Sequence, residues 1–270
     1  MKYNYRIFSP CGNNTALVFG LEYLPQRKEI NDAIMLRHSD VEQVGFLSGD
    51  KNNPRLEMAG GEFCGNAARS AAFWYLDGKR GDLDICVSGI SRKLKAGVCG
   101  DGEAYAEMPV KEISKENAAV RTKGIFHIPL YGIEFLIVDK NKTKESFAEI
   151  PFDETNIKRL GLDLIKEYGL LTNLASGVIF LDGGGSKIRI NPCVWVKAVK
   201  TLFYETACGS GSVATAIQQA LFVGLEDNFA IEQPSGKIIH CGLKMKDGKV
   251  KYAQISGEVL TDKQVYEGNI

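Results

Sequence analysis

The sequence predicts an α/β (α+β) protein built from two domains. With 270 residues and 29.6 kDa, it is long enough for two medium domains that each bury a core. Strand-like and helix-like runs alternate, and their order repeats: each half has strands, then a Cys-Gly pair, then a helix of small residues. The two pairs begin at Cys64 and Cys208, 144 positions apart.

The first half begins with a strand-like run at 16–24 and an amphipathic helical pattern at 28–38. Small and apolar residues occupy every side of the run from Asn66 to Asp77, so we expect a buried helix that ends at Gly78. Short strands interrupted by glycines follow at 83–108.

The second half predicts strands near 124–138, a helix near 155–168, strands near 177–182 and 187–196, and a helix from about Ser212 to Val223. Near the end, Asp247-Gly248 between strand-like runs indicates a hairpin. The run from Gly183 to Ser186 also joins two strand-like runs. We therefore interpret it as a hairpin turn, whereas a phosphate-binding loop would lead into a helix.

The charge balance argues against polyanionic partners. Lys plus Arg and Asp plus Glu each number 33, and no basic block stands out, so the composition favours a small-molecule partner over nucleic acid or a membrane surface. No run is long and apolar enough for a transmembrane helix, and the start lacks the apolar core of a secretory signal. We expect a cytoplasmic protein.

Seven cysteines without C-x-x-C spacing fit neither a disulfide framework nor a zinc knuckle, so most should be free thiols. His38, His127 and His240 are scattered and lack metal-ligand spacing, and no metal is expected. A single cysteine is most often just a small buried side chain. Two cysteines in matching contexts ask for a chemical explanation.

The start of a helix suits both an anion and a reactive thiol. Its backbone N–H groups lack helical partners and carry partial positive charge, which favours a bound carboxylate and also favours thiolate over thiol. Glycine after each cysteine allows close backbone approach, and Asn66 or Ser210 could cap the helix or donate to a ligand.

Two such units facing one α-carbon could remove a proton from one side and return one to the other. The two helix ends would stabilise the developing carbanion, so no cofactor is strictly required.

At these residues the chain resembles the diaminopimelate epimerase family, which includes cofactor-independent racemases of other amino acids, histidine among them. The matching segments are Gly12-Asn13, Glu42-Gln43-Val44-Gly45, Cys64-Gly65-Asn66, Cys208-Gly209-Ser210-Gly211, Ile255-Ser256-Gly257 and Tyr266-Glu267-Gly268. The resemblance spans nearly the whole chain, and the two Cys-Gly motifs in this order are its specific part.

The resemblance implies two pseudo-symmetric domains, each an antiparallel sheet or barrel curled around a central helix, with the active site in the cleft between them. The first would cover residues 1–118, completed by a strand at about 259–270, and the second 119–258. A homodimer is expected by the same likeness. Cys64 and Cys208 would be the acid/base pair, and the substrate contacts implied are Asn13, Gln43, Gly65, Asn66, Asn191, Gly209 and Ser210.

The departures from the family bear on the substrate. Arg55 replaces the asparagine that epimerases carry nine residues before the first cysteine, and the stretch from Lys197 to Tyr204 lacks their Glu-Arg-Gly. Those groups grip the distal end of diaminopimelate, so we expect a racemase of a different free amino acid. Histidine is the first choice, since Phe203 and Tyr204 suit an imidazole if they line the distal pocket.

Three alternatives remain open. Diaminopimelate epimerase itself would need the missing Glu-Arg-Gly. The phenazine-biosynthesis-like isomerases share the architecture but work without the paired cysteines. A protein of another class could bind an amino acid without turning it over, and exchange of the Cα proton would distinguish this case.

Overall fold

The computed structural model describes residues 1–20, 26–143, 151, 153–184, 187–197, 200–225 and 228–270. The described chain forms two compact units. Unit 1 contains Met1–Glu107 and Ile255–Ile270, and unit 2 contains Met108–Gln254. Both mix helices with a predominant sheet content, so the predicted α+β composition is confirmed.

Unit 1 follows a regular order of strands and helices. Its elements are β1 (Lys2–Pro10), β2 (Thr15–Phe19), α1 (Arg27–Arg37), β3 (Gln43–Ser48), β4 (Arg55–Met58), α2 (Gly65–Tyr75), β5 (Gly81–Val87), β6 (Leu94–Gly100), β7 (Glu103–Met108), the last part of β16 (Lys249–Thr261) and β17 (Tyr266–Asn269). Antiparallel pairs β1–β2, β3–β4 and β5–β6 alternate with parallel pairs β2–β3 and β4–β5, which the two helices connect.

Helix α2 is the core of unit 1. Its alanines at 67, 68, 71 and 72 are fully buried and pack against Phe8 of β1, Leu17 of β2 and Leu56 of β4. Alanine side chains allow the helix to lie close to strands on several sides, as the predicted all-round burial requires. Helix α1 covers the opposite face through Ile30 and Ile34.

Unit 2 repeats this order of pairings. Its elements are β8 (Ala119–Thr122), β9 (Ile125–Pro129), β10 (Glu134–Asp139), α4 (Glu154–Glu167), β11 (Ala175–Gly184), β12 (Lys187–Val196), β13 (Thr201–Tyr204), α5 (Gly209–Gln218), β14 (Asn228–Glu232), β15 (Ile238–Lys246) and the first part of β16. Antiparallel pairs β9–β10, β11–β12 and β14–β15 alternate with parallel pairs β10–β11 and β12–β14, across α4 and α5.

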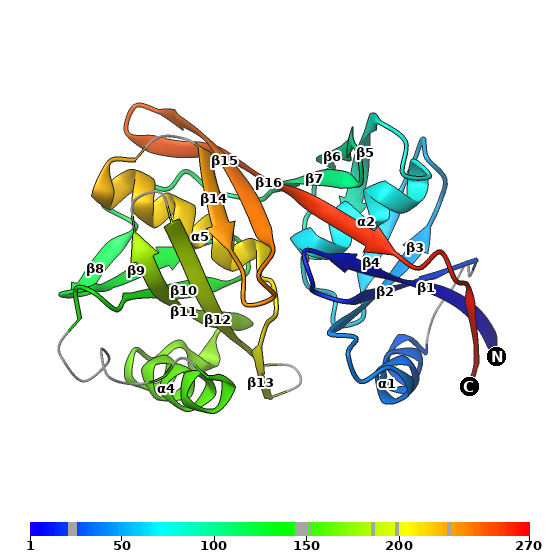
Figure 1. Ribbon diagram of the computed structural model, residues 1–270, viewed down its shortest axis with the longest axis horizontal. Coiled ribbons are helices and arrows are strands. Elements are labelled where there is room, and N and C mark those ends of the chain that lie inside the picture. Colours follow the sequence, from blue (N-terminus) through cyan, green and yellow to red (C-terminus); the bar gives the residue numbers. More distant parts are fainter. Residues whose placement is uncertain (21–25, 144–150, 152, 185–186, 198–199, 226–227) are drawn as a thin grey trace. The chain divides into compact units, whose positions relative to one another are not determined.

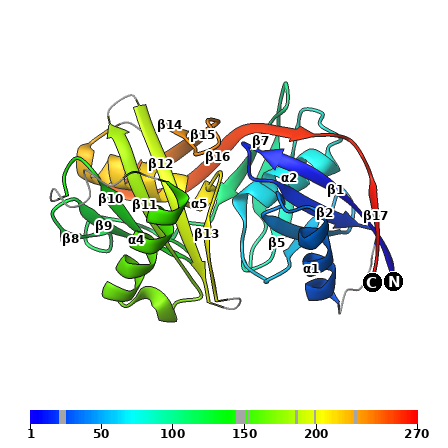
Figure 2. The same cartoon turned by 60° about the horizontal axis from the view of Figure 1, so that its bottom comes forward.

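The two helices of unit 2 lie on opposite faces of its sheet (Figures 1 and 2). Helix α5 contacts strands β9 to β12, β14 and β15, and its residues from 211 to 218 are buried. Helix α4 packs on β11, β12 and β13, where Ile157, Leu164 and Ile165 meet Val178 and Phe180. The first residue of α5 is Gly209, whereas the sequence predicted a start near Ser212.

Two predicted turns fit their flanking strands. Asp247 and Gly248 have φ of 53° and 70°, the left-handed pair that closes a two-residue hairpin between β15 and β16. Gly184 of β11 pairs with Lys187 of β12, so the run from Gly183 to Ser186 joins antiparallel strands as predicted; its residues 185–186 lie outside the described part.

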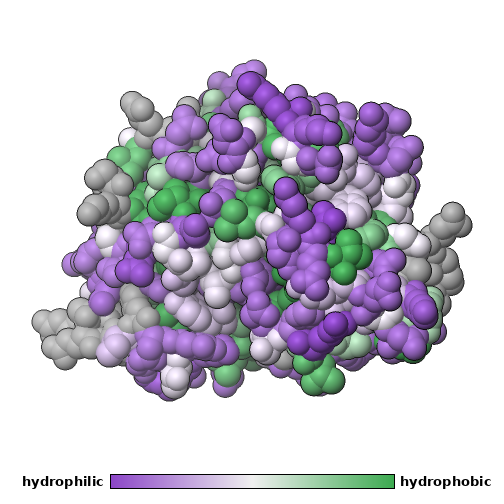
Figure 3. Space-filling view, turned by 45° about the vertical axis from the view of Figure 1, so that its right-hand side comes forward, coloured by the Kyte–Doolittle hydropathy of each residue, from purple (hydrophilic) through white to green (hydrophobic). Residues whose placement is uncertain are grey.

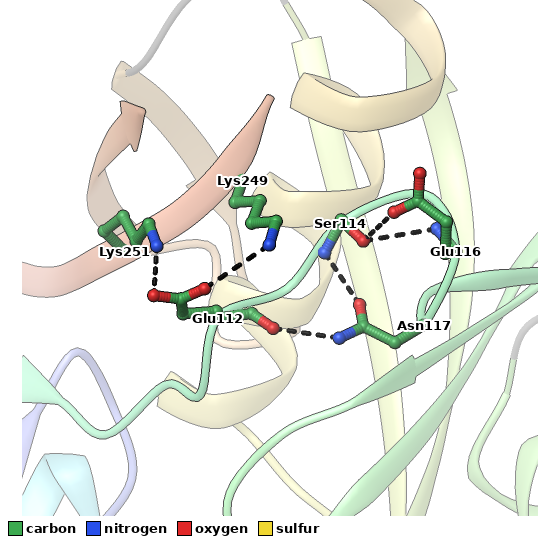
Figure 4. Close-up of polar contacts among 6 residues, drawn as sticks. All are labelled: Glu112, Ser114, Glu116, Asn117, Lys249 and Lys251. Carbon is green, nitrogen blue, oxygen red and sulfur yellow. Dashed lines mark hydrogen bonds and ion pairs between the residues drawn. The ribbon is translucent and has the colours of Figure 1, made fainter. Parts of the chain in front are cut away.

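The segment after β7 is fastened to β16 within unit 2 (Figure 4). Ile113 forms an antiparallel bridge with Val250, and the Glu112 carboxylate makes ion pairs with Lys249 and Lys251 on either side. Asn117 closes the turn, because its amide donates to the Glu112 carbonyl at 2.9 Å and accepts from the N–H of Ser114 at 2.7 Å.

The face drawn in Figure 3 is mostly hydrophilic, and the hydrophobic residues that the structure describes there form small separate groups. Scattered exposed apolar residues such as Leu36 and Leu174 are ordinary for a globular surface. Within the described ranges, no helix is both long and apolar enough to cross a bilayer.

Candidate functional site

Cys64 is the N-cap of α2. Its backbone is extended (φ −134°, ψ 115°), and its Sγ accepts a hydrogen bond from the N–H of Ala67 at 3.3 Å. The sulfur therefore takes the position in which serine or aspartate usually caps a helix. Gly65 and Asn66, both buried, are the first two residues of the helix. The half-buried sulfur lies in the positive field of the helix start, which favours a thiolate.

Gln43 at the start of β3 contacts the same sulfur. The Cys64 thiol donates to Gln43 Oε1 with a separation of 2.6 Å between sulfur and oxygen. Two predicted site residues that are 21 positions apart are thereby in direct contact. The resemblance implied that Gln43 contacts the substrate, and the structure shows that its amide oxygen also contacts the thiol.

Asn13 and Asn66, the other polar site residues predicted in unit 1, are both buried and hydrogen-bonded. The Asn13 amide donates to the carboxylate of Glu42 at 2.7 Å. Asn66 Oδ1 accepts from Nη2 of Arg69 at 2.8 Å. Arg69 was not predicted as a site residue, although it is the single charged residue of α2, which could have drawn attention to it.

Cys208 repeats this arrangement in unit 2. It is the N-cap of α5 (φ −120°, ψ 105°), and its Sγ accepts from the N–H of Gly211 at 3.2 Å. Gly209 and Ser210 are the first two residues of the helix, in the same relative positions as Gly65 and Asn66. Of the two roles considered for Asn66 and Ser210, capping belongs instead to a cysteine sulfur in both helices, and donation to a ligand stays a prediction.

Gln233 is a site residue that the sequence did not indicate. It is fully buried, and its Oε1 accepts from the backbone N–H of Cys208 at 2.9 Å. Its Nε2 donates to Ser212 Oγ and to the carbonyl of Ile231. The Gln233 amide is buried and hydrogen-bonded at both its oxygen and its nitrogen, so it stabilises the turn that positions Cys208.

Asn191 and the two candidate aromatic residues divide between the faces of the unit 2 sheet. Tyr204 packs with the hydrophobic cluster beneath α4, and its hydroxyl donates to Asn191 Oδ1 at 3.2 Å. Successive residues of a strand point to opposite faces, so Phe203 points away from α4. Only Phe203 therefore shares the face of α5, and ordinary core packing explains Tyr204.

The acidic residues near the cysteines have different surroundings. Desolvation by the surrounding protein raises the pKa of the Glu62 carboxyl, although the residue keeps an exposed surface; hydrogen bonds from the N–H groups of Glu62 and Gly60 oppose this rise. Burial raises the pKa of Cys193 to about 12, and the nearby charge of Glu205 adds to the rise. Cys193 is therefore a protonated core thiol.

The histidines have local hydrogen-bond partners. His38 Nε2 lies 2.9 Å from the Tyr5 hydroxyl, and His127 lies between Arg121 and Glu134 at 2.9 and 2.7 Å. Within the described ranges, no three His, Cys, Asp or Glu residues form a group that could hold a metal ion. Arg55 has an exposed side chain.

Comparison with known proteins gives both a family and a fold. Residues 2–268 match the family model described as the histidine racemase CntK N-terminal domain. A histidine racemase of Fusobacterium nucleatum subsp. nucleatum (strain ATCC 25586) is 31% identical over 278 aligned positions, which cover 96% of this chain and 95% of the relative.

Two solved structures are similar to the whole chain. A hydroxyproline epimerase from Agrobacterium vitis has a TM-score of 0.64 at 13% identity and covers 98% of this chain and 92% of its own. A phenazine biosynthesis protein of the PhzF family from Bacillus anthracis also has a TM-score of 0.64 at 13% identity, with full coverage of both chains. At such identities the likeness concerns the fold alone.

Proposed function

We propose, from the premise that this chain belongs to the histidine racemase family, that it interconverts L- and D-histidine with Cys64 and Cys208 as its two bases. The chain is an isomerase of the racemase type. The observation that carries the assignment of the bases is that both cysteines occupy the same position, the N-cap of a buried small-residue helix, with Sγ accepting a backbone N–H.

The reaction needs one thiolate and one thiol. The thiolate takes the Cα proton of the substrate, which leaves a carbanion, and the opposite thiol gives its proton to the other face of the carbon. Each sulfur ends in the protonation state that the other had, and the reverse reaction restores the start. This proposal requires both sulfurs to reach one α-carbon from opposite sides.

The carboxylate of the substrate would be held by the starts of both helices. The N–H groups of Gly65, Asn66, Gly209 and Ser210 lack intrahelical partners by position and are suited to an anion. As the carbanion forms, its charge spreads onto the carboxylate, where these donors stabilise it. The residues thus supply the electrostatic stabilisation without an electron-sink cofactor.

Histidine is favoured as the substrate by the curated relatives and by Phe203. Diaminopimelate epimerase remains the rival activity, although the described residues at 200–204 include none of its Glu-Arg-Gly. Membership in the wider diaminopimelate epimerase architecture, with Asn13, Gln43 and Asn191 in contact with substrate, rests on the matching motifs. A site in a cleft between two pseudo-symmetric domains rests on the same motifs.

The cysteine content also favours a reducing compartment. Seven cysteines without C-x-x-C spacing suit the reducing cytoplasm. A homodimer is proposed by likeness to the family, and light scattering coupled to size-exclusion chromatography would measure it. A monomer at the concentrations used for assays would overturn that part alone.

Substrate choice is tested by incubating the reduced protein, without added cofactor, with each L-amino acid in D₂O. We expect loss of the Cα–H signal in proton NMR spectra for histidine first. Loss for diaminopimelate alone would favour the epimerase. Tight binding of histidine without any exchange of its Cα proton would favour a non-catalytic binding protein.

A further inference from the structure

Arg69 is a buried charge in the helix that begins at Cys64. Its exposed fraction is 0%, and it is the largest of the fully buried side chains in the described part of the chain. Nη2 donates to Asn66 Oδ1 at 2.8 Å, while Nη1 and Nη2 lie 3.6 and 3.8 Å from Cys11 Sγ. Nε makes no hydrogen bond, and none of the ion pairs found among the described residues involves Arg69.

A buried guanidinium without a carboxylate is unusual. Arginine does not lose its proton in a protein, so the charge cannot be removed by titration. An amide oxygen and a sulfur solvate the guanidinium but bring no full negative charge, and an uncompensated buried charge is costly. The environment of Arg69 therefore favours an anion near the first turn of α2.

The same contact fixes the orientation of the Asn66 amide. Arginine offers only donors, so Asn66 must turn Oδ1 toward it. The amide nitrogen is thereby directed away from Arg69, and in this orientation the outward group of Asn66 is a donor, as binding of a carboxylate requires. Without Arg69, the amide could rotate and present its oxygen to the carboxylate, and two oxygens repel.

We propose that Arg69 is a positioning residue for the substrate carboxylate: it holds Asn66 in the donating orientation, and the bound carboxylate balances its buried charge. The inference rests on the proposed function, since it takes the carboxylate to be that of the amino acid docked at the start of α2. Cys11, through its contact with the guanidinium, joins this helix to the turn that carries Asn13.

Replacing Asn66 by aspartate tests the charge without any substrate. Asn66→Asp would give Arg69 the missing carboxylate and place a negative charge at a helix start. We expect its midpoint of thermal unfolding to rise by several degrees above the wild type, and racemisation to fall at least 100-fold because the donor is lost. An unchanged or lower midpoint would overturn the claim that Arg69 lacks a counter-charge.

Replacing Arg69 tests the positioning role. Arg69→Met and Arg69→Lys are compared with Arg80→Met, which removes an exposed arginine of unit 1. The affinities of L-histidine and of L-histidinol, which lacks the carboxylate, are measured by calorimetry. We expect Arg69→Met to weaken histidine binding roughly 10- to 100-fold and histidinol binding less than two-fold, with Arg69→Lys intermediate and Arg80→Met unchanged.

Equal weakening for both ligands, or wild-type affinity for histidine, would overturn the positioning role. Should Arg69→Met fail to fold, the ligand affinities of Arg69→Lys and the thermal midpoint of Asn66→Asp test the proposal in its place. Failure of the wild type to racemise histidine would contradict the proposed function alone. The claim that Arg69 lacks a counter-charge is tested separately, because the thermal unfolding of Asn66→Asp requires no turnover.

Discussion

The thiol of Cys64 donates to Oε1 of Gln43 across 2.6 Å, which gives the proposed base a partner able to serve both of its protonation states. An amide oxygen accepts from a thiol, and after rotation of the amide its nitrogen donates to a thiolate. A base that alternates between acid and conjugate base would need such a partner. Backbone donors such as the N–H of Ala67 stabilise only the thiolate.

Gln43→Glu should therefore bias Cys64 toward the thiol. A carboxylate beside the sulfur disfavours the thiolate, so the pKa of Cys64 should rise relative to the wild type and activity at neutral pH should fall roughly ten-fold. The pH dependence of alkylation of the Cys64 peptide, followed by mass spectrometry in a Cys208→Ser background, measures this. Gln264→Glu, at an exposed position, is the control. Identical profiles for Gln43→Glu and wild type would refute the contact.

Gly211→Ala should displace the second cysteine. A Cβ at this position would lie 2.6 Å from Cδ1 of Ile179 and 3.0 Å from Sγ of Cys208, so the sulfur or the strand must move. We expect a loss of about 1–3 kcal/mol in the free energy of unfolding and at least ten-fold lower kcat. Gly242→Ala should behave like the wild type, because the described atom that its new methyl would meet within 4 Å is Asn228 Oδ1, at an ordinary contact distance of 3.4 Å. Full activity of Gly211→Ala would show that the sulfur is not confined.

Cys193 should lower stability at high pH. Its pKa is about 12 in the folded state and about 8.5 when unfolded, so between these values the unfolded state binds fewer protons. The contribution is fully present below pH 8.5 and is lost as pH rises toward 12, by at most about 1.4 kcal/mol per pH unit. Urea unfolding at pH 9 to 11 should show a steeper decline for wild type than for Cys193→Ala. Parallel declines would contradict the assignment.

Phe203 and Tyr204 should have separable effects. Because they lie on opposite faces of β13, Phe203→Ala should raise KM for histidine several-fold with little change in unfolding temperature. Tyr204→Phe should cost about 1 kcal/mol of stability through the lost bond to Asn191, with KM nearly unchanged. Steady-state kinetics and thermal melts check both, and the reverse pattern would place Tyr204 in the pocket instead.

Local signals in the sequence predicted most elements because their causes are local. The helix predicted at 28–38 is α1, Arg27–Arg37, and the run ended by Gly78 is α2. The turn at Asp247-Gly248 has the positive φ angles that its residue types favour. The start of α5 was placed three residues late, because cysteine is not an expected N-cap and its sulfur contact appears only in the folded chain.

The site was predictable where it depended on motifs and not where it depended on tertiary contacts. Both Cys-Gly pairs are found at helix starts, as predicted. The contact of Gln43 with Cys64, the support of Cys208 by Gln233 and the bond of Arg69 to Asn66 were missed. The first two contacts join residues more than 20 positions apart, which local sequence patterns do not reveal. The third could be predicted only if the burial of Arg69 were already known.

The most direct test of the two-base account follows L-histidine in D₂O with the wild type, Cys64→Ala and Cys208→Ala. The account predicts that wild type forms D-histidine carrying deuterium at Cα, since the arriving proton comes from the second sulfur, and that neither variant racemises. D-histidine that retains its original hydrogen, or full racemisation by either variant, would contradict it.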